Sequence, residues 1–100
     1  MKENKFKQEL TKEIVNRFPG SIVLHLDPNE CQGIPDLLVL FPDKKGWAVL
    51  EGKKSENEPY RPNQEYYLKQ MNDMSFARTI YPENKEDILN EIQQSFQFGR

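Results

Sequence analysis

Residues 33–64, GIPDLLVLFPDKKGWAVLEGKKSENEPYRPNQ, form the stretch on which the fold depends. They contain two apolar runs, LLVLF at 37–41 and WAVL at 47–50, separated by the polar sequence PDKKG at 42–46. This arrangement predicts a β-hairpin with a loop of about four or five residues. Because both runs are almost continuously apolar, we expect strands that are covered on both faces of a sheet.

Charged residues lie at one end of this hairpin, where apolar side chains would be expected. Asp36 precedes the first run, and Glu51 and Lys53 follow the second. Residues two apart on a strand point to the same face, and counting back from the loop places Asp36 opposite Glu51 or Gly52. Opposed residues lie roughly 4.5–5.5 Å apart. The hairpin therefore predicts a metal site with a lysine beside it; the alternative is an ordinary solvated strand preceded by a Pro-Asp turn.

The residue types at this end indicate Mg²⁺ chemistry on an anionic substrate. Mg²⁺ prefers carboxylate and carbonyl oxygens and usually binds one or two protein carboxylates together with substrate phosphate. Asp36, Glu51 and the carbonyl of Gly52 supply such a set, and Lys53 would orient the attacking water or offset charge on a phosphoryl group. We therefore expect a phosphodiester substrate. The single histidine and single cysteine cannot form a zinc cluster, and no glycine-rich loop indicates a nucleotide cofactor.

Length and composition predict one domain over residues 1–100, with 36% hydrophobic residues and a net charge of −2. This balance does not indicate a nucleic-acid-binding protein, but basic residues gather around the hairpin. These residues are Lys44, Lys45, Lys53, Lys54 and Arg61. All but Lys53 are expected to contact DNA; the alternative is that the basic residues form a solvated face. A lone cysteine, the absence of an apolar leader and the absence of any membrane-length apolar run predict a soluble intracellular protein without membrane contact.

Residues 3–18 predict an amphipathic helix that ends at Pro19-Gly20. Its apolar stripe recurs at four-residue spacing: Phe6, Leu10, Ile14 and Phe18. Glu3 lies within the same stripe and is a candidate third carboxylate, although an acid at this position also suits the positive end of the helix dipole. Glu9 and Glu13 fall toward the edge of the stripe.

The rest of the chain predicts a strand at 21–26, a helix from the capping residue Asn63 to Met74, a strand at 76–81 and a last helix after Asn84. The helix that ends at Met74 is expected to pack through a stripe of four residues: Tyr67, Leu68, Met71 and Met74. His25 and the acids of the 27–30 loop are expected to be structural, and the last four residues are expected to fray. The predicted order is helix, three strands, helix, strand, helix. An α/β sheet with helices on its faces is the natural packing.

The segments GIPDLLVL, WAVLEGKK and RPNQ resemble the VRR-NUC family of restriction-endonuclease-like nucleases, with its Pro-Asp … Glu-x-Lys signature. The resemblance covers nearly the whole chain and is greatest to small stand-alone phage members. It implies an αβββαβ core with a mixed central sheet flanked by helices, here with an extra C-terminal helix.

The same resemblance implies site roles for individual residues. Asp36 and Glu51 would be metal ligands, Lys53 the catalytic lysine, and Gln64 would lie near the scissile phosphate. The helix-1 acid of the family would be Glu3, with these two acids as alternatives: Glu9 and Glu13. Gly52 departs from the pattern, because a bulkier residue such as valine is more usual between the glutamate and the lysine.

The resemblance therefore implies a Mg²⁺-dependent, structure-specific DNA endonuclease in which Mn²⁺ substitutes for Mg²⁺. Stand-alone members resemble homodimeric Holliday-junction resolvases that act on branched DNA and leave 5′-phosphate ends. The alternatives are a flap or general duplex nuclease of the same family and a non-catalytic DNA-binding module that keeps the fold.

Overall fold

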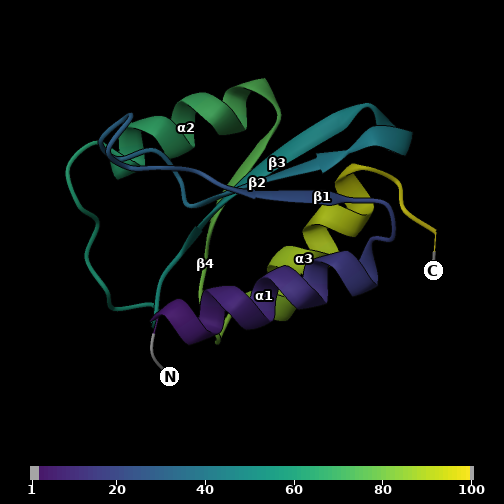
Figure 1. Cartoon of the computed structure of the whole chain (residues 1–100), viewed down its shortest axis with the longest axis horizontal. Coiled ribbons are helices and arrows are strands. Elements are labelled where there is room, and N and C mark those ends of the chain that lie inside the picture. The colour runs from purple at the N-terminus through teal and green to yellow at the C-terminus, as the bar shows by residue number, and fades with distance from the viewer. Residues whose placement is uncertain (1–2, 100) are drawn as a thin grey trace.

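A four-stranded sheet forms the centre of the computed structural model, which describes residues 3–99 (Figure 1). Its strands lie side by side in sequence order: β1 (Ile22–His25), β2 (Leu37–Phe41), β3 (Gly46–Gly52) and β4 (Phe76–Ile80). The first three strands are antiparallel, whereas β3 and β4 are parallel. Parallel neighbours need a crossover, and a helix between β3 and β4 provides it.

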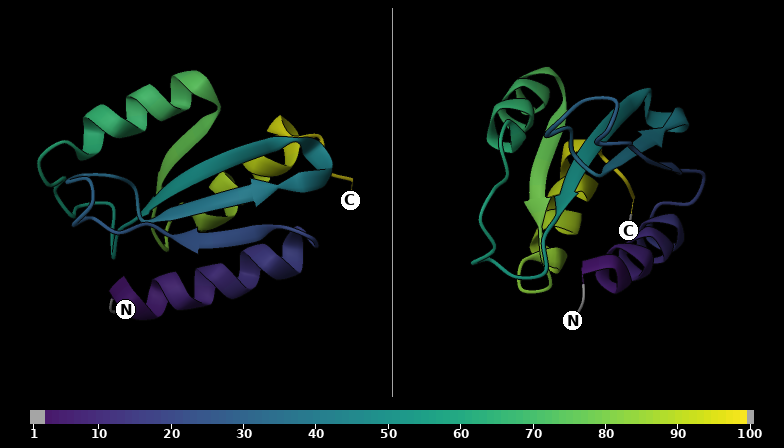
Figure 2. Two further views of the ribbon diagram at one scale, coloured as in Figure 1. Left: turned by 45° about the horizontal axis from the view of Figure 1, so that its top comes forward. Right: turned by 60° about the vertical axis from the view of Figure 1, so that its left-hand side comes forward.

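Three α-helices cover the two faces of the sheet: α1 (Glu3–Arg17), α2 (Gln64–Met74) and α3 (Lys85–Ser95). Helices α1 and α3 lie on one face, and the crossover helix α2 lies on the other (Figures 1 and 2). The element order is the one that the sequence predicts, including the additional C-terminal helix. No helix in the described part of the chain is long and apolar enough to span a membrane.

The main core lies between the sheet and helices α1 and α3. All four residues of the predicted apolar stripe of α1 are buried, and so are the inward side chains of α3: Ile88, Leu89 and Ile92. Burying each large apolar side chain contributes roughly 1.5–3 kcal/mol. This core fixes the position of α1 against the strands of the sheet.

Strand β2 is less covered than the sequence predicts, whereas β3 is covered as predicted. Strand β3 is buried on both faces from Ala48 to Gly52, as predicted. Leu38 and Leu40 of β2 are only half-buried, because α2 packs over β3 and β4. The prediction that both strands are covered on both faces is therefore wrong for β2.

The hairpin loop has the predicted length. Phe41 pairs with Gly46, which leaves four loop residues, three of them in the short 3₁₀ helix η1 (Pro42–Lys44). Lys45 closes the turn in the left-handed conformation, with φ of 53°. A side chain at Gly46 would place its Cβ 2.6 Å from the ring of Phe96, so only glycine fits there.

The start and end of α2 also differ from expectation. Asn63 precedes the helix but has φ of 70° and makes no capping hydrogen bond. The side-chain hydrogen bond at this helix start comes from the next residue: Gln64 Oε1 accepts from the backbone N–H of Arg61 at 2.7 Å. At the other end Met74 is 68% exposed rather than packed. The loop before β2 explains the first difference, because Gly33 (φ 91°) lies so close to Asn63 that a Cβ would be 2.6 Å from it.

The C-terminal tail packs onto the core, so the prediction that it frays is wrong within the described residues. The Phe98 ring lies 4.7 Å from that of Phe18 and 5.1 Å from that of Phe41, measured between centroids. Phe96 stacks against Phe41 at 4.9 Å. These aromatic contacts close the hairpin end of the molecule, opposite the charged end.

Candidate active site

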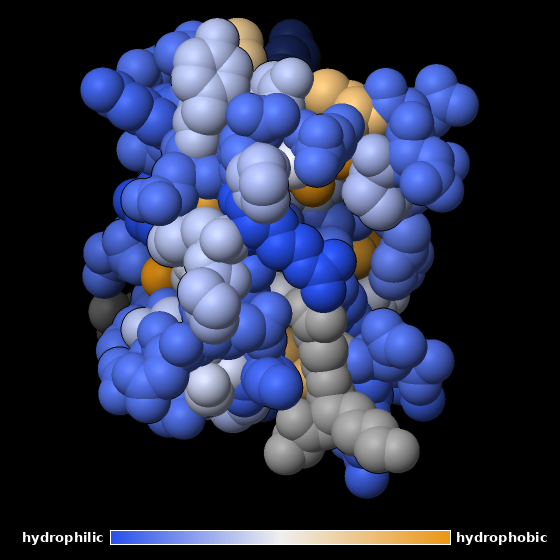
Figure 3. All heavy atoms as spheres, turned by 90° about the vertical axis from the view of Figure 1, so that its left-hand side faces the viewer, coloured by the Kyte–Doolittle hydropathy of each residue, from blue (hydrophilic) through white to orange (hydrophobic). Residues whose placement is uncertain are grey.

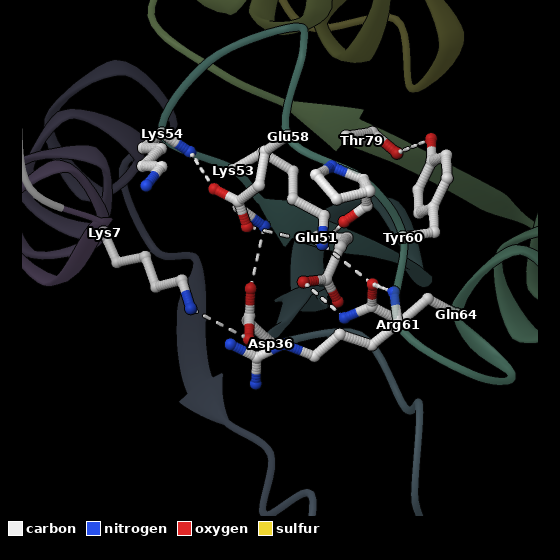
Figure 4. A network of polar contacts seen from close by, with 12 residues as sticks. Lys7, Asp36, Glu51, Lys53, Lys54, Glu58, Tyr60, Arg61, Gln64 and Thr79 are labelled. Carbon is white, nitrogen blue, oxygen red and sulfur yellow. Dashed lines mark hydrogen bonds and ion pairs between the residues drawn. The ribbon is translucent and has the colours of Figure 1, made fainter.

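The charged ends of β2 and β3 meet as the sequence predicts. Leu37 pairs with Leu50, so continuing the register by one residue places Asp36 opposite Glu51. Asp36 Oδ2 accepts a hydrogen bond of 2.8 Å from the amide of Gly52. Because the N–H and C=O of one residue face the same neighbour in an antiparallel ladder, the Gly52 carbonyl faces this side too. Figure 4 shows the side chains that gather here.

Glu51 is a buried carboxyl group, only 2% exposed. Its Oε2 accepts a hydrogen bond of 3.2 Å from the Gln64 amide nitrogen. Its Oε1 is buried without a hydrogen-bond donor in the described part of the chain. Burial first, and then the neighbouring Asp36, raise the pKa of Glu51 to about 8, although the nearby lysines oppose the shift. Two close carboxyl groups, one of them with a buried oxygen that accepts no hydrogen bond in the described chain, form a site suited to a cation.

Lys53 is equally buried, at 2% exposure, and its ammonium group is held by oxygen acceptors. Its Nζ donates to Gln64 Oε1 at 2.8 Å and to the Pro59 carbonyl at 3.3 Å, and it lies 3.6 Å from the Glu58 carboxylate. The Tyr60 ring lies 5.4 Å from the same atom. Hydrogen bonds of this kind offset the cost of burying a charge and fix its position.

Gln64 links the two buried charges. Its amide nitrogen donates to Glu51, and its oxygen accepts from Lys53 and from the Arg61 backbone (Figure 4). The residue begins α2, so the helix start fixes this amide between the strand residues. The structure thus places Gln64 beside Glu51 and Lys53, and its expected position near a scissile phosphate stays a prediction.

Two side chains of this site were not predicted from the sequence. Lys7 reaches over from α1, and its Nζ lies 3.0 Å from Asp36 Oδ1. Glu58 pairs with Lys53; burial raises its pKa, but the Lys54 amide and the Lys53 ammonium lower it overall. The position of Lys7 directly after Phe6 of the apolar stripe was the available signal, because it places this lysine beside the packed face of α1.

A polar cleft of about 520 Å³ opens over these groups. Its lining includes residues from α1, from the loop before β2, from β3 and from the start of α2: Lys7, Asn29, Gln32, Asp36, Glu51, Lys53, Arg61 and Gln64. Hydrophilic residues cover most of this end of the molecule (Figure 3). The opening suits a polar ligand.

The structure narrows the choice of a helix-1 acid. Glu13 pairs with Lys85 of α3 at 2.8 Å, and Glu9 also acts on this lysine, whose pKa these acids raise. Neither acid lines the cleft. Glu3 begins α1, one turn before Lys7, and its side chain lies outside the described part of the structure. Among the described side chains, no group of three His, Cys, Asp or Glu is placed to hold a metal ion.

The predicted basic cluster is divided by the hairpin. Arg61 lines the cleft, and exposed Lys54 directly follows Lys53. Lys44 and Lys45 lie at the hairpin loop, about 20 Å from Glu51 at roughly 3.3 Å per strand residue. All five basic residues lie around the hairpin, but Lys44 and Lys45 are remote from the two acids, because the loop and the site occupy opposite ends of the hairpin.

The loop that leads into the site behaves mostly as expected. His25 is exposed on β1 and does not line the cleft. Asp27 caps a turn by accepting the Asn29 amide hydrogen bond at 2.9 Å. Asn29 and Gln32, from the same loop, do line the cleft. Their amide groups are the only polar side chains that this loop brings to the opening within the described chain.

The element order and the mixed sheet are those expected of a restriction-endonuclease-like fold. A solved structure described as "VRR_NUC domain" has this fold: it matches with a TM-score of 0.69 and 22% identity, over 90% of this chain and 97% of that chain. No protein-family model and no curated protein matches the sequence. The structural match confirms the predicted fold class, and with it the resemblance to VRR-NUC domains at the level of the fold.

The residues present fit a Mg²⁺ ion. Mg²⁺ commonly binds through one or two carboxylates and keeps several waters, and Asp36 and Glu51 supply two adjacent carboxyl groups. The unsatisfied Glu51 oxygen and the raised pKa of Glu51 are what a pair of acids shows without its cation. The Gly52 carbonyl adds a third oxygen on the same side.

Proposed function

We propose that this chain is a Mg²⁺-dependent, structure-specific DNA endonuclease that acts as a homodimeric Holliday-junction resolvase. The observation that carries the proposal is the pairing of Asp36 and Glu51 beside the buried ammonium of Lys53, at the base of a polar cleft. The match to a structure described as a VRR_NUC domain supports nuclease chemistry.

Each group has a role in phosphodiester hydrolysis. Asp36, Glu51 and the Gly52 carbonyl would hold Mg²⁺ or Mn²⁺, which supplies an activated water and charge stabilisation at a phosphoryl oxygen. Lys53 would orient the attacking water or stabilise negative charge on the phosphate. Gln64 holds the Lys53 ammonium and would lie near the scissile phosphate. Glu3 remains the candidate helix-1 acid of this proposal.

The DNA contacts follow from where the basic residues lie. Arg61 and Lys54, next to the site, would contact phosphates flanking the cleaved bond. Lys44 and Lys45 would contact only DNA that extends about 20 Å beyond it. A 100-residue chain offers little surface to grip a four-way junction, and two paired cuts need two sites. Both points favour a symmetric dimer. Cleavage by such a dimer would leave 5′-phosphate ends.

The test compares cleavage of labelled four-way junction, flap and linear duplex DNA with Mg²⁺, Mn²⁺ or chelator. Asp36→Asn and Lys53→Met should each abolish cleavage and leave DNA binding. Lys12→Met, at an exposed position of α1 outside the cleft, is a charge-matched control for the lysine variant and should retain activity. Metal-dependent cutting by the purified double variant would refute the assignment. Binding without cutting in either metal would favour the non-catalytic module, and faster cutting of flap or duplex would favour the other nuclease types.

A further inference from the structure

Helix α1 places the ammonium group of Lys7 beside the acidic pair, Asp36 and Glu51. The lysine projects from α1 into the cleft, and both members of its ion pair are largely shielded, with side-chain exposures of 19% for Lys7 and 25% for Asp36. The core residues of α1 on either side, Phe6 and Leu10, are buried. The helix backbone therefore holds the base of this lysine in place, while its four-carbon chain lets the ammonium group move.

Gly52 makes room for this lysine. A Cβ at position 52 would lie 3.1 Å from both Cγ and Cε of Lys7, closer than nearly all real contacts, and 3.5 Å from Asp36 Oδ2. The aliphatic part of Lys7 thus crosses the bare backbone of Gly52 to reach Asp36. Lys7 reaches Asp36 through the space that a side chain at position 52 would occupy.

The hydrogen bonds of the two carboxyl groups leave one shared place for a cation. Asp36 Oδ2 is bound by the Gly52 amide, and Glu51 Oε2 by Gln64. The oxygens that remain are Glu51 Oε1, which has no donor in the described chain, and Asp36 Oδ1, which faces the Lys7 ammonium. Asp36 Oδ1 is the Asp36 oxygen that accepts no backbone hydrogen bond, so a divalent ion that draws on both acids would compete with the Lys7 ammonium for it.

We propose that Lys7 is an internal counter-ion that competes with the divalent metal for Asp36, and that Gly52 is the space this competition requires. The inference rests on the proposed metal-dependent function. In the metal-free protein Lys7 balances the charge of the acidic pair, and metal binding displaces its ammonium from Oδ1. The metal affinity is therefore lower than the carboxylates alone would give.

Metal affinity can be measured without DNA or catalysis, by titrating the full chain with Mn²⁺ under electron paramagnetic resonance and with Mg²⁺ by calorimetry. Lys7→Met keeps the aliphatic volume and removes the charge, and should tighten binding roughly fivefold or more, which reflects the loss of one partly shielded ion pair. Lys5→Met removes the same charge from an exposed position of α1 and should leave the affinity within about twofold. Gly52→Ala keeps the lysine but displaces it, and should also tighten binding.

The outcomes separate the inference from the function on which it rests. Equal affinities for wild type and Lys7→Met, with binding lost in Asp36→Asn, would overturn the counter-ion role and leave the metal site standing. An equal gain in Lys5→Met would also overturn it, because general charge would then explain the effect. Weaker metal binding by Lys7→Met would show that this lysine supports the metal. No binding by any variant would remove the metal site and the proposed function together.

Discussion

Replacing Glu51 by Gln is expected to remove a pH dependence from the folding stability of the metal-free protein. The pKa of Glu51 is raised from 4.5 to about 8 in the folded chain, first by burial and then by Asp36. Between these two values the folded state holds a proton that the unfolded state has lost. The free energy of unfolding therefore falls as the pH rises through this window, by up to about 1.4 kcal/mol per pH unit.

The assay is urea unfolding in chelator at several pH values from about pH 5 to about pH 9. The informative quantity is the difference in unfolding free energy between Glu51→Gln and wild type, because other titrating groups cancel from it. This difference should move in favour of the variant with increasing pH and level off above about pH 8. The control is Glu56→Gln, in an exposed loop. Its unfolding free energy should change with pH in parallel with that of wild type.

Mg²⁺ provides a second arm of the same experiment. A metal ligand must be deprotonated, so Mg²⁺ should stabilise wild type more at about pH 8 than at about pH 6. Glu51→Gln should lose most of this gain. Parallel unfolding curves for Glu51→Gln and wild type across the whole range would refute the reasoning, because Glu51 would then titrate alike in both states.

Two further predictions concern the tail and the DNA surface. Phe98→Ala should lower the free energy of unfolding by about 1–3 kcal/mol in urea, because it removes ring contacts with Phe18 and Phe41 from a half-buried position; an unchanged midpoint would show that the tail does not pack in solution. Arg61→Ala should weaken junction binding about equally for all sequences and reduce the salt slope by about 1, whereas Lys12→Ala, at an exposed position of α1 outside the cleft, should leave the rate of cutting unchanged.

Local sequence patterns predicted the elements and the acidic end of the hairpin. Two apolar runs joined by a short loop are enough to set a register, because counting back from the loop places Asp36 opposite Glu51 or its neighbour. The four-residue spacing that begins at Phe6 likewise identified the buried face of α1. Both depend only on residues close together in the chain, or joined by a short loop.

Interactions between distant segments could not be predicted in this way. Asn63 has the residue type of a helix cap, but the loop carrying Gly33 packs against it and holds it in a left-handed conformation. Lys44 and Lys45 are near the acids in sequence, yet a strand of seven residues separates them in space. Lys7 is distant in sequence and adjacent in space. In each case tertiary packing decided the outcome.

The placement of Gln64 explains how two opposite charges remain usable side by side. Glu51 and Lys53 lie two apart on one strand face, and a direct ion pair between them would neutralise both. Gln64 instead directs its amide hydrogens to the carboxylate and its oxygen to the ammonium. A glutamate at this position could satisfy Lys53 but would repel Glu51. An apolar residue would remove the donor to Glu51 Oε2 and the nearest acceptor of the Lys53 ammonium. A neutral amide at the start of α2 is therefore what keeps one group available for a cation and the other for a phosphate.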